Sequence, residues 1–247
     1  MSTVFFRIFG VKFLNANINS ILKIIDKSNL IVVPSGPGLA SVDKDKEYLQ
    51  AIQSADFAVL DSGYFCILLF FFKGLVVKKI SGLLLTKNFI KHISKKKNTT
   101  LFTIDPNKIE SLENKKLLES KSISMGKHQY VAPFYNPKKI IDKKLKKILQ
   151  RVKPRYILIN LGSGVQEVLG SYLAKNLSYN PKPTILCTGA AIAFLTRRQA
   201  PVSDLFDRMY LGWLVRCFYN PRKFIQRYAK AFRLLLLVKK HKLLKLK

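Results

Sequence analysis

The chain has 247 residues, of which 48% are apolar, so it can bury a sizeable core and is not an intrinsically disordered protein. Its formal net charge of +30 predicts a polyanionic partner: nucleic acid, an anionic membrane surface or phosphate-bearing substrates. AT-biased coding, which favours lysine, is an alternative source of part of this charge.

Short apolar runs alternate along the chain with helix-length segments whose apolar residues recur at helical spacing. Strands are expected at residues 3–9, 30–33, 57–61, 99–105, 156–161 and 184–188. Helices are expected at residues 17–26, 43–55, 63 onward, 83–95, 107–116, 137–152 and 165–174. This alternation predicts an α/β fold with a mostly parallel, Rossmann-like sheet covered by helices. In such sheets, ligands bind beyond the carboxyl ends of the strands.

The chain changes character after residue 200. Residues 201–247 contain twelve Lys or Arg against two Asp, and no further strand is expected there. Helices are expected at 204–219 and 221–238, followed by a basic tail. We therefore predict two domains: an α/β catalytic domain at 1–200 and a basic helical appendage at 201–247 that lies on an anionic membrane surface.

Cysteine usage and hydropathy indicate the compartment. Cys66, Cys187 and Cys217 are widely spaced in apolar contexts, which favours buried thiols in a reducing cytoplasm over a disulfide framework. No signal peptide is visible, and the longest apolar run, residues 64–72, is shorter than the ~20 residues of a membrane-spanning helix. A cytoplasmic protein with at most peripheral membrane contact is therefore expected.

Asp61 is the first candidate for chemistry, because it ends an apolar strand just before a turn and a helix. A carboxylate in that position is partly desolvated and can serve as a general base. The structural alternative is an N-cap, since Asp is favoured immediately before a helix.

Small residues follow two later strands. Gly162 and Gly189 would let backbone N–H groups approach a phosphate at a helix N-terminus, although a plain strand-to-helix turn is the alternative. The Walker lysine is missing, which excludes a P-loop. Gln166 and Glu167 either hydrogen-bond a ribose or base edge or simply begin a helix.

The histidines offer no metal-binding pattern. His92, His128 and His241 are scattered, and there is no cysteine pair or carboxylate cluster. We therefore expect neither a metal nor another cofactor.

Taken in this order, these segments resemble the WecG/TagA/CpsF family of bacterial glycosyltransferases. The likeness covers roughly residues 15–230 and is strongest over 153–228. It is carried by the upstream segments Ala55-Asp56-Phe57, Asp61-Ser62-Gly63 and Lys79-Ile80-Ser81-Gly82, and then by Lys153-Pro154-Arg155, Asn160-Leu161-Gly162, Gln166-Glu167, Gly189-Ala190-Ala191, Ala200-Pro201, Leu211-Gly212-Trp213, Asn220-Pro221-Arg222 and Gln226-Arg227-Tyr228.

The resemblance implies transfer of an N-acetylmannosamine-type sugar from a UDP-sugar to a polyprenyl-diphosphate-linked acceptor at the inner face of the cell membrane. It implies no obligatory metal. Asp61 falls on the family's proposed catalytic base. The implied donor-binding residues are Ser35, Lys79, Gly162, Gln166, Glu167 and Gly189. The implied contacts to the acceptor diphosphate and the membrane are Arg216, Arg222 and Arg227.

The chain departs from the family pattern near the presumed donor pocket, at Val33, Ser35, Lys79, Ala193 and Gln199. These departures leave the exact sugar open, and they motivate an alternative: a catalytically weakened member that scaffolds a polysaccharide assembly complex. A nucleic-acid-binding protein is a further alternative on charge alone, but the sequence contains no recognised nucleic-acid module. Self-association is also an expectation, because the C-terminal helices need cover.

Overall fold

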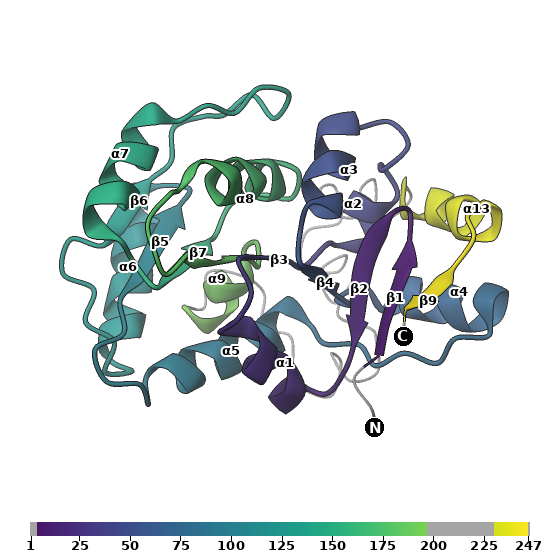
Figure 1. Ribbon diagram of the computed structural model, residues 1–247, viewed down its shortest axis with the longest axis horizontal. Helices are drawn as coiled ribbons and strands as arrows, with labels where there is room; N and C mark the ends of the chain where they lie inside the picture. The colour runs from purple at the N-terminus through teal and green to yellow at the C-terminus, as the bar shows by residue number, and fades with distance from the viewer. Residues whose placement is uncertain (1–3, 197–229, 247) are drawn as a thin grey trace.

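The computed structural model describes residues 4–196 and 230–246, and every structural statement below concerns these residues. They fold around one nine-stranded sheet with helices on both faces (Figure 1). The predicted α/β fold is therefore confirmed. Several residues singled out above lie outside the described ranges, namely Gln199, Arg216, Cys217, Arg222 and Arg227.

The strands are β1 (Val4–Ile8), β2 (Val11–Asn15), β3 (Leu30–Val32), β4 (Phe57–Val59), β5 (Leu101–Asp105), β6 (Gln129–Val131), β7 (Tyr156–Ile159), β8 (Thr184–Cys187) and β9 (Leu244–Leu246). Their order in the sheet is β6-β5-β7-β8-β3-β4-β2-β1-β9. Every neighbouring pair from β6 to β2 is parallel, whereas β1 and β9 extend the sheet by antiparallel pairing. The carboxyl ends of β7, β8, β3 and β4 therefore lie next to one another.

The helices form two layers, one on each face of the sheet. One layer contains α2 (Gly36–Leu39), α3 (Lys46–Gln53), α4 (Gly63–Lys73), α7 (Lys143–Val152), α8 (Val165–Asn176) and, after a 3₁₀ turn at Lys230–Phe232, α13 (Arg233–Lys240). The other contains α1 (Ile18–Ile25), α5 (Gly82–Ile93), α6 (Lys108–Glu119) and α9 (Ala191–Leu195). No helix in this part of the chain is both long and apolar enough to cross a bilayer.

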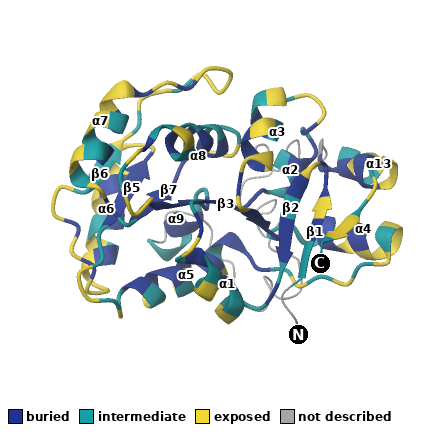
Figure 2. Cartoon of the chain, viewed as in Figure 1, coloured by how far each residue is buried: buried dark blue, intermediate teal, exposed yellow. Residues whose placement is uncertain are grey.

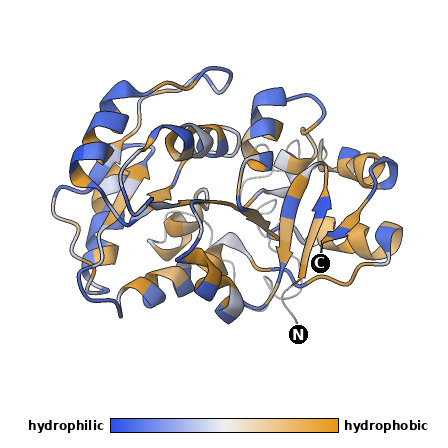
Figure 3. Cartoon of the chain, in the orientation of Figure 1, coloured by the Kyte–Doolittle hydropathy of each residue, from blue (hydrophilic) through white to orange (hydrophobic). Residues whose placement is uncertain are grey.

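The central strands are buried on both faces (Figure 2) and apolar along most of their length (Figure 3). In β7, Ile157 and Ile159 face one helix layer, whereas Tyr156 and Leu158 face the other. This alternation is the period-2 side-chain pattern of a strand, with both faces in the core. It explains why these strands appear in the sequence as continuous apolar runs.

Three strands were not expected from the sequence: β2, β6 and β9. β2 is joined to β1 by a hairpin whose two turn residues, Phe9 and Gly10, have φ of 57° and 74°. Turns with two positive φ values match the twist of antiparallel strands, but the usual Asn-Gly signal is absent here. The strand expected at residues 3–9 therefore corresponds to β1 alone, and β2 was missed.

The expectation that no strand follows residue 201 is wrong. Residues Leu244–Leu246 form β9, which pairs with β1 at Phe5↔Leu246 and Arg7↔Leu244. An uncovered edge strand presents unpaired backbone groups, and β9 covers that edge of β1. The division into domains at residue 200 stays a prediction. The described end of the predicted appendage adds α13 to one helix layer and β9 to the edge of the sheet.

A polar cluster at the amino-terminal edge of the sheet ties α1, α5 and β7 together. The carboxylate of Asp26 accepts hydrogen bonds from Lys96 Nζ (2.5 Å) and the Tyr156 hydroxyl (2.5 Å), and His92 Nε2 lies 3.1 Å away. Burial alone would raise the pKa of Asp26, but these hydrogen bonds outweigh it and hold that pKa below its ordinary value. The ionised carboxylate is therefore more stable in the folded chain than in the unfolded chain.

We predict that Asp26→Ala lowers the free energy of unfolding by about 2 kcal/mol at neutral pH, because a charged group loses its hydrogen bonds. The folded-state pKa lies below the unfolded value of 3.8, so this stabilisation is present above that pH and is lost as the pH falls through the folded-state pKa. Urea unfolding across the acid range measures the difference.

Asp43→Ala is the matched control. Asp43 forms a half-exposed ion pair with Arg233 (2.5 Å), whose loss should cost less than about 1 kcal/mol. Equal losses in the two variants, or an Asp26 effect that does not depend on pH, would contradict the role of the cluster.

Candidate functional site

The loops that follow β3, β4 and β7 touch one another at the carboxyl edge of the sheet. A Cβ atom added to Gly36, after β3, would lie 2.7 Å from Ser62 Oγ, after β4. A Cβ atom on Gly38 would lie 2.9 Å from Ser163 Oγ, after β7. A side chain at either position would force these hydroxyl groups to move, so glycine lets the loops approach closely.

A pocket of about 360 Å³ opens between α2, the start of α3 and the loop after β7. Gly162, Ser163 and Gly164 form one wall, and the buried Tyr48 lies beneath. A Cβ atom on Gly38 would come within 2.7 Å of the Tyr48 hydroxyl, so glycine also keeps the pocket open. The volume lies within the range of roughly 300–1,000 Å³ that is usual for small-molecule sites.

Asp61 lies at the end of β4, half-buried beside these loops. Its Oδ1 accepts a hydrogen bond of 2.8 Å from the backbone N–H of Gly82, the first residue of α5. The N-cap of α4 is Ser62, whose hydroxyl accepts from Phe65 N. The alternative that Asp61 is the helix cap is therefore wrong, and its carboxylate instead ties the end of β4 to the start of α5.

The first turn of α5 lies against two further strand ends. A Cβ atom on Gly82 would lie 3.4 Å from the carbonyl oxygen of Thr188, after β8, and 3.7 Å from Val33 Cγ1, after β3. Val33, one of the departures from the family pattern, is thus buried against the segment that holds Asp61. The strand ends that carry the predicted site residues are therefore in mutual contact.

Lys79 lies in the segment that leads into α5. The neighbouring Ile80 donates its N–H to Leu60 O (2.9 Å), so this segment runs beside the end of β4. Burial raises the pKa of the Cys66 thiol to about 12, with Lys79 lowering that pKa and Asp61 raising it further. Lys79 and Asp61 therefore act on the same small region.

Gln166 and Glu167 fasten the loops after β7 and β8 to each other. Gln166 is only 2% exposed; its Oε1 accepts from Gly189 N (2.6 Å) and its Nε2 donates to Glu167 Oε1 (3.0 Å). Glu167 Oε2 accepts from Gly164 N (2.7 Å). Gly189 has φ of 65°, a conformation that L side chains rarely adopt.

These bonds bear on the expected phosphate contacts. The N–H groups of Gly164 and Gly189 are already bonded to side chains, so a phosphate could reach them only after Glu167 and Gln166 release them. The assignment of Gly162, Gly189 and Glu167 to donor binding stays a prediction.

Thr188 also lies at this edge, but the sequence did not indicate a role for its side chain. The hydroxyl of Thr188 is buried and has no hydrogen-bond partner among the described residues. Such a group is costly to leave unpaired, which makes it a candidate contact for a polar ligand atom. The signal in the sequence was its position directly after a strand, immediately before Gly189.

The remaining predicted residues that the structure describes do not line the pocket beside Asp61. Ser35 is half-buried and caps α2, its hydroxyl accepting from Gly38 N (3.3 Å). Ala193 is buried within α9.

Over residues 4–196 and 230–246, no three His, Cys, Asp or Glu side chains are grouped as metal ligands would be. Gln199 and the three arginines lie outside the described residues, so their places relative to the pocket stay predictions.

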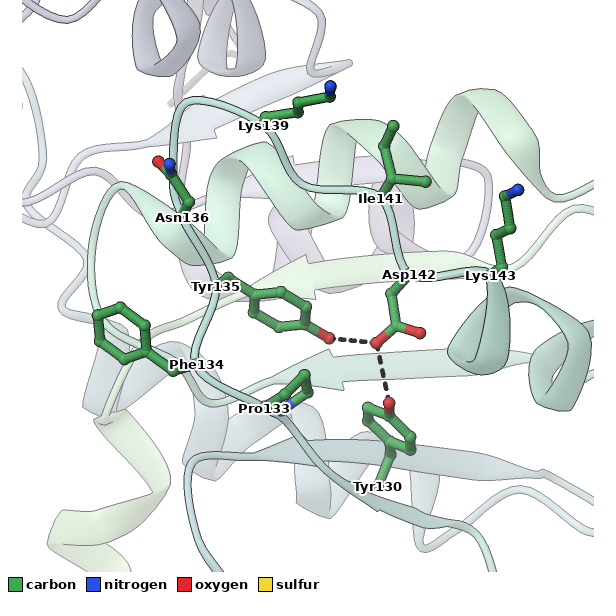
Figure 4. A pocket seen from close by; sticks show the side chains of 9 residues that line it. All are labelled: Tyr130, Pro133, Phe134, Tyr135, Asn136, Lys139, Ile141, Asp142 and Lys143. Atoms are coloured by element: carbon green, nitrogen blue, oxygen red, sulfur yellow. Dashed lines mark hydrogen bonds between the residues drawn. The ribbon is translucent and has the colours of Figure 1, made fainter.

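A larger pocket of about 480 Å³ lies between β6 and α7 (Figure 4). There Asp142 accepts from the hydroxyls of Tyr130 (2.9 Å) and Tyr135 (2.6 Å), and also caps α7. Burial and these bonds raise the pKa of Tyr130 to about 12 and that of Tyr135 further, so both hydroxyls stay protonated near neutral pH. Three strands separate β6 from β3, and none of the predicted site residues lines this pocket. The predicted site residues lie instead at the edge that holds Asp61, and the assignment of the chemistry to that edge stays a prediction.

Comparison with known protein families identifies the family of the chain. The model of the family described as "Glycosyl transferase WecG/TagA/CpsF family" matches residues 6–247, which is nearly the whole chain. No curated protein matches the chain significantly. The match confirms the resemblance seen in the sequence, and the chain belongs to the WecG/TagA/CpsF family of glycosyltransferases, which act in cell-surface polysaccharide synthesis.

Proposed function

We propose that this glycosyltransferase moves an N-acetylmannosamine-type sugar from a UDP-sugar to a polyprenyl-diphosphate-linked amino sugar, with inversion at the anomeric carbon. The observation that supports this most is the carboxylate of Asp61, held by Gly82 N at the strand edge beside the pocket loops. Asp61 takes the proton of the acceptor hydroxyl. The hydroxyl oxygen bonds to the anomeric carbon as the bond to UDP breaks on the opposite face.

Cationic side chains offset the charge that develops on the departing diphosphate. Lys79 is the described candidate, because it lies beside the end of β4 with Asp61. Arg216, Arg222 and Arg227 are proposed to bind the acceptor diphosphate and anionic lipid, where each basic residue near the surface contributes ~1 kcal/mol. This assignment rests on their match to the family pattern.

Donor recognition is proposed to use the pocket wall and the unpaired hydroxyl at the end of β8. Gly162 and Ser163 are exposed on that wall, and the Ser35 hydroxyl accepts from the N–H of Gly38, which lines the same pocket. The orphan hydroxyl of Thr188 supports a bond to a polar donor atom. Gln166 is proposed to act as a positioning residue, because both ends of its amide group bond to protein groups.

We predict that Asp61→Asn lowers turnover by 10²- to 10⁴-fold, the usual contribution of a general base, while the unfolding midpoint changes little. An asparagine keeps an oxygen that can accept from Gly82 N, so the link between β4 and α5 survives. The measurement is UDP release with vesicles that carry a polyprenyl-diphosphate-linked N-acetylglucosamine, across a panel of UDP-sugars.

Acceptor-dependent UDP release that is lost in this variant would establish both the reaction and the base. Retained turnover in the variant would rule out Asp61 as the base. Calorimetry with the same UDP-sugars covers the alternative of a scaffold, which would bind vesicles but neither bind nor consume any donor.

A second prediction concerns Gln166. Gln166→Ala leaves Gly189 N without its acceptor, so the loop after β8 loosens, and the KM for the donor should rise about tenfold with a smaller change in kcat. The lost buried hydrogen bonds should also lower the free energy of unfolding by about 1–3 kcal/mol.

Gln150→Ala is the matched control, because the Gln150 amide makes one exposed hydrogen bond to Ser178 (3.4 Å). Its donor KM should equal that of the unmodified chain. An unchanged donor KM in Gln166→Ala would show that the loop after β8 does not contribute to donor binding.

A further inference from the structure

The segment that follows Asp61 leaves the site as a helix and returns to it. α4 begins directly after Asp61 and Ser62, and at 1.5 Å per residue its eleven residues carry the chain about 16 Å outward. Gly74, with φ of 58°, ends the helix. The chain then runs back until Ile80 N bonds Leu60 O at the end of β4. Whatever the outer face of α4 binds is therefore held close to the site.

α4 is apolar on its outer face as well as on its inner face. Its inner residues, including Phe65 and Leu69, are buried in the core. On the outside, Phe70 is 53% exposed and Phe71 is 73% exposed. A helix that is apolar all round normally lies inside a protein or a membrane, so the outer face of α4 lacks a partner among the described residues.

α13 and β9 continue this apolar surface. Lys73 Nζ donates to Lys239 O (3.3 Å), and the ring of Tyr64 packs edge-on against Phe232 with centroids 6.0 Å apart. α4, α13 and β9 lie together at one end of the molecule (Figure 1). Eight of the fourteen large apolar side chains exposed in the described residues belong to this end. We call these eight the α4–α13 face: Ile67, Phe70, Phe71, Phe72, Val76, Phe232, Leu236 and Leu244.

The segments that carry the α4–α13 face are strongly cationic. Residues 63–80 and 231–246 contain eight Lys or Arg and no Asp or Glu. One of these cations, Arg233, pairs with Asp43. Apolar side chains surrounded by cations complement an anionic lipid surface, which accepts both. A second copy of this chain would bring the same positive charge to the interface, so it is the less favoured partner.

We propose that the α4–α13 face docks on an anionic lipid bilayer, with Phe70 and Phe71 entering the boundary between headgroups and acyl chains. The surrounding lysines lie among the headgroups. The carboxyl edge of β4 then lies close to the membrane, where a lipid-linked acceptor would be held. Only this last consequence rests on the proposed function, because lipid binding itself does not require sugar transfer.

The test is co-sedimentation of the full chain with phosphatidylcholine vesicles, with and without phosphatidylglycerol. The double variant Phe70→Ser/Phe71→Ser should bind the anionic vesicles at least tenfold more weakly, because a buried Phe side chain contributes about tenfold or more to such partitioning. The unmodified chain should bind pure phosphatidylcholine more weakly, and added salt should weaken its binding to the anionic vesicles.

Phe134→Ser is the matched control. Phe134 is fully exposed on the loop before α7, so its loss removes an equal apolar side chain from another surface and should leave vesicle affinity unchanged. Unchanged binding by the double variant, or an equal loss in the control, would overturn the proposal.

Two other occupants give different results, and either would overturn the proposal. A second copy of the chain would appear as a dimer that the double variant abolishes in sedimentation velocity, with vesicle binding unchanged. Cover by another segment of this chain would appear as a lower unfolding midpoint in the double variant.

A failure of the proposed sugar transfer can be told apart from a failure of lipid docking, because vesicle binding is measured without any sugar. If transfer occurs, the double variant should match the unmodified chain on a short-chain, water-soluble acceptor and fall behind it only on a vesicle-borne acceptor.

Discussion

The parallel pairing of β7, β8, β3 and β4 side by side is the constraint on which the site depends. The pairs Leu158↔Leu186, Leu30↔Ile185 and Val32↔Ala58 fix the register of all four strands. Because the strands point the same way, the loops that follow them leave at one edge, although they are up to about 150 residues apart in the chain. Parallel strands also require cover on both faces, and the two helix layers provide it.

Side chains of the protein hold these loops in place. Asp61, Gln166 and Glu167 each accept a hydrogen bond from the backbone N–H of a glycine in another loop or at a helix start. An edge fixed in this way needs little reorganisation when substrate binds, which favours catalysis by positioned charges. The same bonds use N–H groups that a phosphate-binding loop would leave open. Donor recognition should therefore depend on side chains such as Lys79 rather than on an open backbone cradle.

Much of the central sheet could be predicted from the sequence, because buried parallel strands appear as apolar runs with a turn at each end. The position of Asp61 at a strand end followed directly from the apolar run that precedes it and forms β4. β9 could not be predicted in this way, because its pairing with β1 joins residues about 240 positions apart and three residues of local sequence do not indicate a partner.

The roles of the Gln166 and Thr188 side chains could not be predicted from the sequence either. A polar residue after a strand can point into a pocket or into the protein, and only the fold shows that the Gln166 amide bonds the loop after β8. The orphan state of the Thr188 hydroxyl is likewise a property of its packed surroundings.

In the proposed arrangement, the charge of the chain and the apolar outer face of α4 depend on each other. An apolar surface that includes Phe70 and Phe71 would promote aggregation of a neutral protein. A net charge of +30 opposes that aggregation, because free copies of the chain repel one another. The same charge attracts the chain to an anionic surface, where its repulsion is screened and the apolar side chains leave water. The lysine content alone is compatible with any polyanionic partner. Together with the apolar outer face of α4, it favours an anionic lipid surface.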